Sequence, residues 1–230
     1  YFTKEQARDI VEYAARHHIT VIPEIDLPGH MLAALTAYPS LGCTGGPYGV
    51  WGRWGVSPDV LCAGNDSTLT FIDDVLNEVM DIFPSKYVHI GGDECPKTRW
   101  KECPKCQKRI SELGIKPEGR FSAEDKLQGV ITTHALQTLA ARGRHAIGWD
   151  EILEGDIPQD AIIMSWRGVD GAIEGTGKGH NVVLSPASYC YLDYYQSPDQ
   201  ALEPMAWGGY VPVSRTYRLD PTEGMTPEQS

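Results

Sequence analysis

Two adjacent carboxylates, Asp93 and Glu94, follow a glycine pair at the end of a short apolar run, residues 87–90. A carboxylate in a dry setting is costly unless it is paired or hydrogen-bonded, so these groups are either neutralised by neighbours or held ready for acid–base chemistry. Side chains alternate across a strand, so both acids reach one cleft only where the strand ends or is distorted, which Gly91 and Gly92 permit. The structural alternative is that one acid caps a helix or meets a buried arginine.

Other short apolar runs also end in polar or aromatic residues. Residues 20–25 lead to Asp26 and His30, 145–148 to Trp149, 161–165 to Trp166, and 181–185 run on toward Tyr191 and Asp193. Aromatic faces stack on sugar rings and carboxylates hydrogen-bond sugar hydroxyls. These strand ends therefore suggest a carbohydrate enzyme, although each tryptophan alone is more often a core residue.

The segments between these runs have helical patterns. We expect helices over 3–18, 67–83, 122–142 and 169–177, the first and third opening with capping-box sequences. Strands that alternate with helices predict a parallel sheet. Five successive strand ends that carry such side chains favour a (β/α)8 barrel, in which all strand ends meet on one face, over a doubly wound sheet. We therefore expect an α/β fold in which residues 1–230 form a central part of a TIM barrel, about five βα units, without the first two strands and the last.

Composition excludes some classes of function. The chain of 230 residues has 31 acidic and 20 basic residues and a net charge of −11, which argues against nucleic acid as a partner. No apolar run approaches the roughly 20 residues that a membrane helix needs. The chain opens on Tyr1 without a methionine, so we interpret it as a segment of a longer protein, and a missing signal peptide says little about its compartment. The oligomeric state is left open.

Six cysteines stand at positions 43, 62, 95, 103, 106 and 190. Cys43 and Cys62 bracket a loop rich in Gly and Trp and could close it as a disulfide. Cys103 and Cys106 have the spacing of metal ligands or of a redox pair, but a structural zinc usually has four ligands, and along the sequence only Cys95 lies nearby as a third. We therefore expect thiols or a local disulfide here, and neither a metal nor a cofactor.

The adjacency of the two acids restricts the chemistry. Most glycosidases place two carboxyls on opposite sides of the scissile bond. Two neighbouring residues on one strand are poorly placed to do this. Substrate-assisted enzymes avoid this because a 2-acetamido group of the substrate supplies the nucleophile and forms an oxazolinium ion. One acid then protonates the leaving oxygen, and an ionised neighbour orients the amide N–H.

The motif "HIGGDE" at residues 89–94 resembles family 20 of the glycoside hydrolases, the β-N-acetylhexosaminidases. The resemblance continues through "VIPEIDLPGH", "GWDE", "SWRG" and "YLD" in order, and covers residues 1 to about 220. It implies exo-hydrolysis of terminal β-linked N-acetylglucosamine or N-acetylgalactosamine from a glycan, with retention. We expect such a protein to be exported to the periplasm, cell surface or medium.

The resemblance also implies a role for each matching residue. Glu94 is the general acid/base, Asp93 polarises the acetamido group, and Tyr191 donates its hydroxyl to the acetamido oxygen. The substrate-binding residues are Trp149 and Trp166 as pocket walls, Asp193 on distal hydroxyls, Asp26, His30 and His89 as a polar network near Glu94, and Trp207 at an outer subsite.

Two family features have no matching position: an early arginine that grips the terminal sugar and a further pocket tryptophan. Rival interpretations are release of a disaccharide, as lacto-N-biosidases do, a non-catalytic sugar-binding domain, and an inert fragment.

Overall fold

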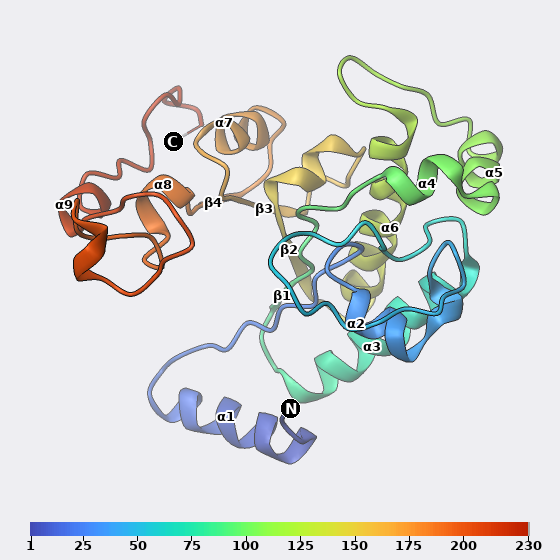
Figure 1. Cartoon of the computed structure of the whole chain (residues 1–230), viewed down its shortest axis with the longest axis horizontal. Helices are drawn as coiled ribbons and strands as arrows, with labels where there is room; N and C mark the ends of the chain where they lie inside the picture. The colour runs from blue at the N-terminus through green and yellow to red at the C-terminus, as the bar shows by residue number, and fades with distance from the viewer. Residues whose placement is uncertain (230) are drawn as a thin grey trace. The chain divides into compact units, whose positions relative to one another are not determined.

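The computed structural model describes residues 1–229, and the chain divides into two compact units, residues 1–161 and Ile162 onward (Figure 1). Both units combine helices with parallel strands. The elements of unit 1 are α1 (Lys4–Arg16), α2 (Leu32–Ala37), η1 (Pro39–Leu41), α3 (Asp66–Ile82), β1 (Tyr87–His89), α4 (Thr98–Glu102), α5 (Pro104–Glu112), α6 (Ala123–Ala140), β2 (His145–Trp149) and η2 (Asp150–Glu154).

The core of unit 1 lies where the two strands meet the long helices. β1 and β2 pair in parallel, with Tyr87 opposite His145 and His89 opposite Ile147. Helix α6 packs against β2, η2 and α3. Residues with no exposed surface fill this region, among them Ile72, Leu76, Val88, Leu127, Ile131 and Leu139. The core therefore fixes the end of β1, from which the two adjacent carboxylates follow.

The helices begin where their capping residues stand. Thr3 and Gln6 form the capping box of α1, Ser122 and Asp125 that of α6, and the Asn65 side chain accepts from Ser67 N at the start of α3. The four helices predicted over 3–18, 67–83, 122–142 and 169–177 are confirmed, each with its start within one residue of the prediction. In this part of the chain no helix is long and apolar enough to cross a membrane.

The strand expected at residues 20–25 is not formed as such. The segment runs beside β1 and makes one isolated parallel bridge, Glu24 with His89, and Ile22 stays 44% exposed. The Pro23 carbonyl accepts from His89 N, but proline has no N–H to return to a ladder. The segment is nevertheless extended and carries Asp26 to the end of β1.

Unit 2 contains β3 (Ile162–Ser165), α7 (Asp170–Gly177), β4 (Val182–Leu184), α8 (Ala187–Cys190), η3 (Gln200–Leu202) and α9 (Val213–Thr216). β3 and β4 pair in parallel, with Ile163 opposite Val182, and α7 packs against both. The expectation that the last strand runs on toward Tyr191 is wrong. Pro186 caps α8 instead, and its carbonyl accepts from Cys190 N at 2.8 Å.

Candidate active site

The backbone after β1 leaves strand geometry and turns both adjacent carboxylates the same way. Gly91 and Gly92 have φ of +66° and +106°, and Glu94 has φ of +44°. His30 Nε2 lies 3.5 Å from Asp93 Oδ2 and 3.3 Å from Glu94 Oε2. Because one imidazole edge contacts both carboxylates, strand alternation no longer separates them.

The peptide groups of Gly92 hold this turn from two sides. Its N–H donates to Asp26 Oδ1 at 3.0 Å, and its carbonyl accepts from the buried Gln128 of α6 at 2.7 Å. Lys97 Nζ donates to Gln128 Oε1 and to the Cys95 carbonyl, both at 2.7 Å. Long-range contacts therefore fix the turn that presents Asp93 and Glu94.

His30 and Glu94 occupy the left-handed region of the backbone map, which residues other than glycine rarely adopt. Their φ values are +51° and +44°. Each such residue costs about 1–3 kcal/mol and persists where its surroundings determine it, often at functional sites. The backbone strain therefore lies at His30 and Glu94, two candidate site residues whose side chains contact one another.

Asp26 and Asp93 are in hydrogen-bond contact, and their pKa values shift in opposite directions. Burial, and then the charge of Asp93, raise the pKa of Asp26 to about 8. Burial alone would raise the pKa of Asp93 as well, but hydrogen bonds from His30 and Asp26 outweigh it and lower that pKa. Among the described residues, Asp93 Oδ1 is buried without a donor unless Asp26 carries a proton. Near neutral pH Asp93 is therefore the ionised member of the pair and Asp26 the protonated one.

His30 carries a positive charge against this pair. Its hydrogen bond to Asp93, together with the nearby charges of Asp26, Asp93 and Glu94, raises the pKa of His30 to about 9 in spite of partial burial. The carboxyl group that is hydrogen-bonded to Asp93 is thus that of Asp26, 67 positions earlier in the chain. Glu94 is the more accessible acid, with 42% of its side chain exposed against 19% for Asp93.

His89 and Trp149 form a second group beside the turn. Their rings lie 4.6 Å apart between centroids, and the indole N–H of Trp149 donates to Glu24 Oε1 at 3.0 Å. His89 Nδ1 accepts from Gly91 N at 3.0 Å, and burial lowers the pKa of this imidazole. His89 therefore supports the turn through Gly91 and a neutral ring.

In unit 2 the structure brings Trp166 and Tyr191 together. Their rings are stacked, with centroids 6.1 Å apart and an interplanar angle of 11°, and Tyr194 meets Tyr191 edge-on at 5.7 Å. Asp193 is exposed, and Trp207 is 58% exposed. A half-buried stack of this kind can contact a sugar ring.

Sequence reasoning missed Glu24 and Gln128. Glu24 stands two positions before Asp26 in an extended segment, and residues at that spacing share a face, which was an available signal. Gln128 is a polar residue on the buried side of α6. Nothing local in the sequence indicated that it contacts Gly92.

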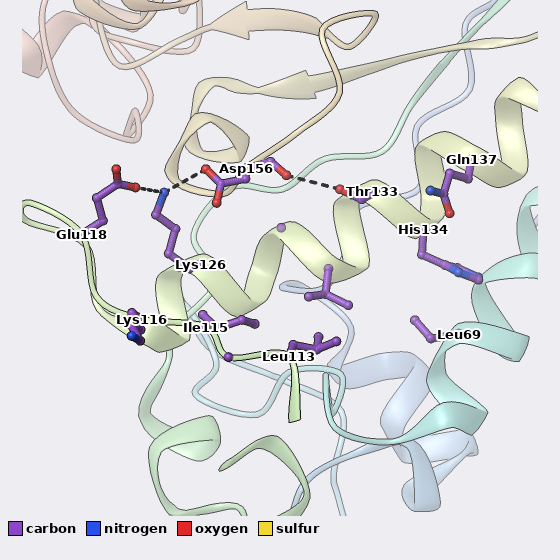
Figure 2. Close-up of a pocket in the computed structure, with 13 residues that line it drawn as sticks. Leu69, Leu113, Ile115, Lys116, Glu118, Lys126, Thr133, His134, Gln137 and Asp156 are labelled. Carbon is purple, nitrogen blue, oxygen red and sulfur yellow. Dashed lines mark hydrogen bonds and ion pairs between the residues drawn. The ribbon is translucent and has the colours of Figure 1, made fainter. Parts of the chain in front are cut away.

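A cavity of about 520 Å³ lies elsewhere in unit 1, between α6 and residues 113–118 (Figure 2). Lys126 spans its rim through ion pairs with Glu118 and Asp156. None of the candidate site residues lines it, and Lys126 is paired with two carboxylates, so the volume alone does not indicate a catalytic site.

Comparison with known proteins decides the family. Residues 1–230 match the model of the catalytic domain of glycosyl hydrolase family 20. The chain belongs to this family.

This family 20 chain is similar to β-hexosaminidases. It is 49% identical over 222 residues to a β-hexosaminidase of Porphyromonas gingivalis, an alignment that covers 96% of the chain and 28% of that protein. A crystal structure of a β-N-acetylhexosaminidase matches 99% of the chain and 48% of its own length, with 29% identity and a TM-score of 0.87. An exo-β-N-acetylglucosaminidase of family 20 from Vibrio harveyi, in complex with N-acetylglucosamine, matches all of the chain and 36% of its own length, with 32% identity and a TM-score of 0.82.

The family 20 chain thus spans between about a quarter and a half of the length of these relatives. Its fold class is that of their (β/α)8 barrel catalytic domain, and its parallel strands with intervening helices form part of such a barrel. The expected fold class and the expected family are confirmed.

Proposed function

We propose that this chain carries catalytic residues of an exo-β-N-acetylhexosaminidase, which removes terminal β-linked N-acetylglucosamine or N-acetylgalactosamine from glycans with retention. The observation that carries the proposal is the arrangement at the end of β1. A carboxylate kept ionised, Asp93, stands next to a more accessible acid, Glu94, and both contact His30.

An ionised Asp93 suits a reaction in which the substrate supplies its own nucleophile. Its negative charge accepts the acetamido N–H and stabilises the positive charge of the oxazolinium ion that forms as the carbonyl oxygen attacks the anomeric carbon. The protonated Asp26 and the charged His30 hold Asp93 in place for this role. A side chain that only bound a neutral sugar would not need its ionised form to be favoured.

Glu94 donates its proton to the leaving glycosidic oxygen and then activates the water that opens the oxazolinium ion. Its greater exposure fits a group that must reach the scissile bond and then water. The roles of Tyr191, Trp166, Trp149, Asp193 and Trp207 are carried over from the motif resemblance: a hydroxyl donor to the acetamido oxygen, two pocket walls, a contact to distal hydroxyls, and an outer subsite.

The test combines two measurements on the full-length protein. A thiazoline that mimics the oxazolinium ion should bind tightly, and a chromogenic N-acetylglucosaminide should be cleaved much faster than the matching plain glucoside. Thiazoline binding without turnover would indicate a sugar-binding protein. Equal cleavage of the two glycosides would refute participation of the acetamido group.

The matched disaccharide substrate distinguishes exo-removal of one sugar from release of a disaccharide. A chromogenic lacto-N-bioside cleaved faster than the monosaccharide glycoside would favour the lacto-N-biosidase interpretation. Export of the parent protein stays a prediction, which cell fractionation tests directly.

A further inference from the structure

Four cysteine sulfurs from two distant parts of the chain converge in unit 1, apart from the carboxylate site. Cys62 Sγ lies 3.7 Å from Cys103 Sγ and 3.7 Å from Cys106 Sγ, and Cys43 Sγ lies 3.8 Å from Cys106 Sγ. All four sulfurs lie within 4.8 Å of one another, and none is in a disulfide. The partners of Cys103 and Cys106 are therefore Cys43 and Cys62, and not Cys95 as the sequence spacing suggested.

These separations fit metal ligation and do not fit bonded sulfurs. A zinc–thiolate bond of about 2.3 Å gives a tetrahedron whose sulfurs lie about 3.8 Å apart. Disulfide sulfurs lie only about 2.05 Å apart. The three shortest contacts, at 3.7–3.8 Å, equal the edge of the zinc tetrahedron.

Two of the four cysteines stand at the start of a helix. Cys103 caps the N-terminus of α5 and Cys106 lies in its first turn, where the helix presents unpaired N–H groups and a positive dipole end. The Gly64 N–H donates to the Cys62 sulfur. Cys62, Cys103 and Cys106 are buried, and Cys43 is half-buried. Such a pocket shields a metal from water and leaves an entry path at Cys43.

The segment that carries Cys62 packs closely against the segment that carries Cys103 and Cys106. A Cβ at Gly64 would lie 2.1 Å from the Lys105 carbonyl carbon and 2.3 Å from Cys106 N, so only glycine allows this approach. The Trp100 indole N–H donates to the Leu61 carbonyl at 2.9 Å, and Trp100 has no exposed surface. The loop that carries Cys62 is thus held against α4 and α5 before any metal is considered.

We propose that Cys43, Cys62, Cys103 and Cys106 bind one structural Zn²⁺ ion. Each thiol gives up its proton to solvent as its sulfur bonds the metal, and no oxidant or reductant is needed. Four tetrahedral sulfurs with no open position suit a closed structural site and leave no coordination position for catalysis. The site is independent of the glycosidase chemistry and its test does not depend on turnover.

The zinc would fix the loop between α2 and α3 onto α5 and so support the candidate active site at a distance. Leu61, next to Cys62, donates its N–H to the Pro28 carbonyl at 3.1 Å. Pro28 lies between Asp26 and His30, which hold Asp93. Removal of zinc should therefore loosen residues 61–62 first and residues 26–30 next.

The test measures metal in the full-length protein purified under reducing conditions without chelator. Elemental analysis should find roughly one zinc per chain. Cys43→Ser should release its zinc to a chelator at a concentration at least about 10-fold lower than the parent does, because a serine hydroxyl is a poor zinc ligand. The matched control is Cys190→Ser, which changes another half-buried cysteine outside the cluster and should retain zinc like the parent.

A second measurement covers the case in which Cys43→Ser fails to fold. Cobalt exchanged into the unmodified protein should give the intense visible bands of tetrahedral sulfur ligation, and amide exchange at Leu61 should accelerate after chelation. Absence of metal with two disulfides by non-reducing mass analysis overturns the proposal. Absence of metal with free thiols also overturns it, as does iron in place of zinc.

Discussion

At the scale of single residues, the decisive feature is that the carboxyl groups of Asp26 and Asp93 face one another but have pKa values shifted in opposite directions. Asp93 remains ionised because His30 and Asp26 both donate to it, whereas partial burial and the charge of Asp93 raise the pKa of Asp26 to about 8. Asp93→Asn keeps the shape of the side chain but removes the charge that stabilises an oxazolinium ion. We expect kcat on N-acetyl substrates to fall by roughly 10²–10³-fold, the size seen when a stabilising group of this kind is lost.

The control for Asp93→Asn is a substrate without the acetamido group. Such a substrate should be poor with the parent protein and little affected by the change. A trapped glycosyl-enzyme ester in the variant, detected by mass spectrometry, would contradict the substrate-assisted mechanism.

Glu94→Gln removes the proton donor without altering its size. We expect turnover to fall by roughly 10²–10⁴-fold, the usual worth of general acid–base catalysis. The loss should be smaller for glycosides with good leaving groups, because these need less protonation. A loss of equal size on activated and natural substrates would contradict the acid role.

Asp26 makes stability depend on pH in a direction opposite to that of most carboxyls. Its pKa is raised from an ordinary 3.8 to about 8, so the protonated form favours the fold, and this contribution is lost as the pH rises toward and through about 8. Asp26→Asn is permanently neutral and can still accept from Gly92. We expect the urea midpoint of the variant to exceed that of the parent by an amount that grows between pH 5 and pH 9.

The exposed Asp9 of α1 offers the matched control, since Asp9→Asn removes one charge from the surface. Its effect on the urea midpoint should show no comparable growth with pH. A midpoint difference for Asp26→Asn that stays constant over the same range would mean that Asp26 is ionised throughout.

At the scale of elements, the turn after β1 depends on a glycine at position 91. A Cβ there would lie 1.9 Å from Asp26 Oδ1 and 2.5 Å from Asp26 Cα, with φ at +66°. Gly91→Ala should lower stability by about 1–2 kcal/mol for the left-handed backbone and by about 1–3 kcal/mol more for the clash. Gly143 has nearly the same φ, +69°, with nothing within 4 Å of its Cβ position, so Gly143→Ala isolates the backbone cost.

Urea unfolding of the two alanine variants separates these contributions. Gly91→Ala should be the less stable protein, and it should also lose activity because Asp26 is displaced. Equal destabilisation of the two would mean that the contact with Asp26 relaxes without cost.

The sequence predicted the elements whose determinants are local. The helices at α1, α3 and α6 follow from capping residues and apolar spacing within one segment. The predicted strand extents were wrong at two places where a proline interrupts the strand. Pro23 leaves residues 20–25 with a single bridge to β1, and Pro186 starts a short helix before Tyr191.

The parts of the site that could not be predicted depend on contacts between distant residues. Asp26 and His30 were expected near Glu94, but the raised pKa of Asp26 follows from its burial and from the nearby charge of Asp93 in the fold. The cysteines give the same lesson: Cys95 is nearest to Cys103 in sequence, yet Cys43 and Cys62 are nearest in space. Spacing along the chain does not show which loop folds back onto α5.

At the scale of the whole molecule, negative charge dominates. The net charge is −11, and the candidate site contributes the carboxylates of Asp93, Glu94 and Glu24 beside the cation His30. An acidic surface lowers the local concentration of anionic substrates, and salt screens this effect because the Debye length falls from about 30 Å at 0.01 M to about 8 Å at 0.15 M. Neutral glycans should be unaffected by the same field.

We therefore predict that salt changes the preference between neutral and anionic substrates. The ratio of kcat/KM for a chromogenic 6-sulfated N-acetylglucosaminide to that for the unsulfated glycoside should rise, on the order of 10-fold, between 0.01 M and 0.5 M salt. The unsulfated glycoside is its own control, since its kcat/KM should stay nearly constant if salt does not alter the fold. A ratio that stays flat would mean that the summed charge does not act at the site. A ratio that falls with salt would mean that a local cation recognises the sulfate and outweighs the surrounding carboxylates.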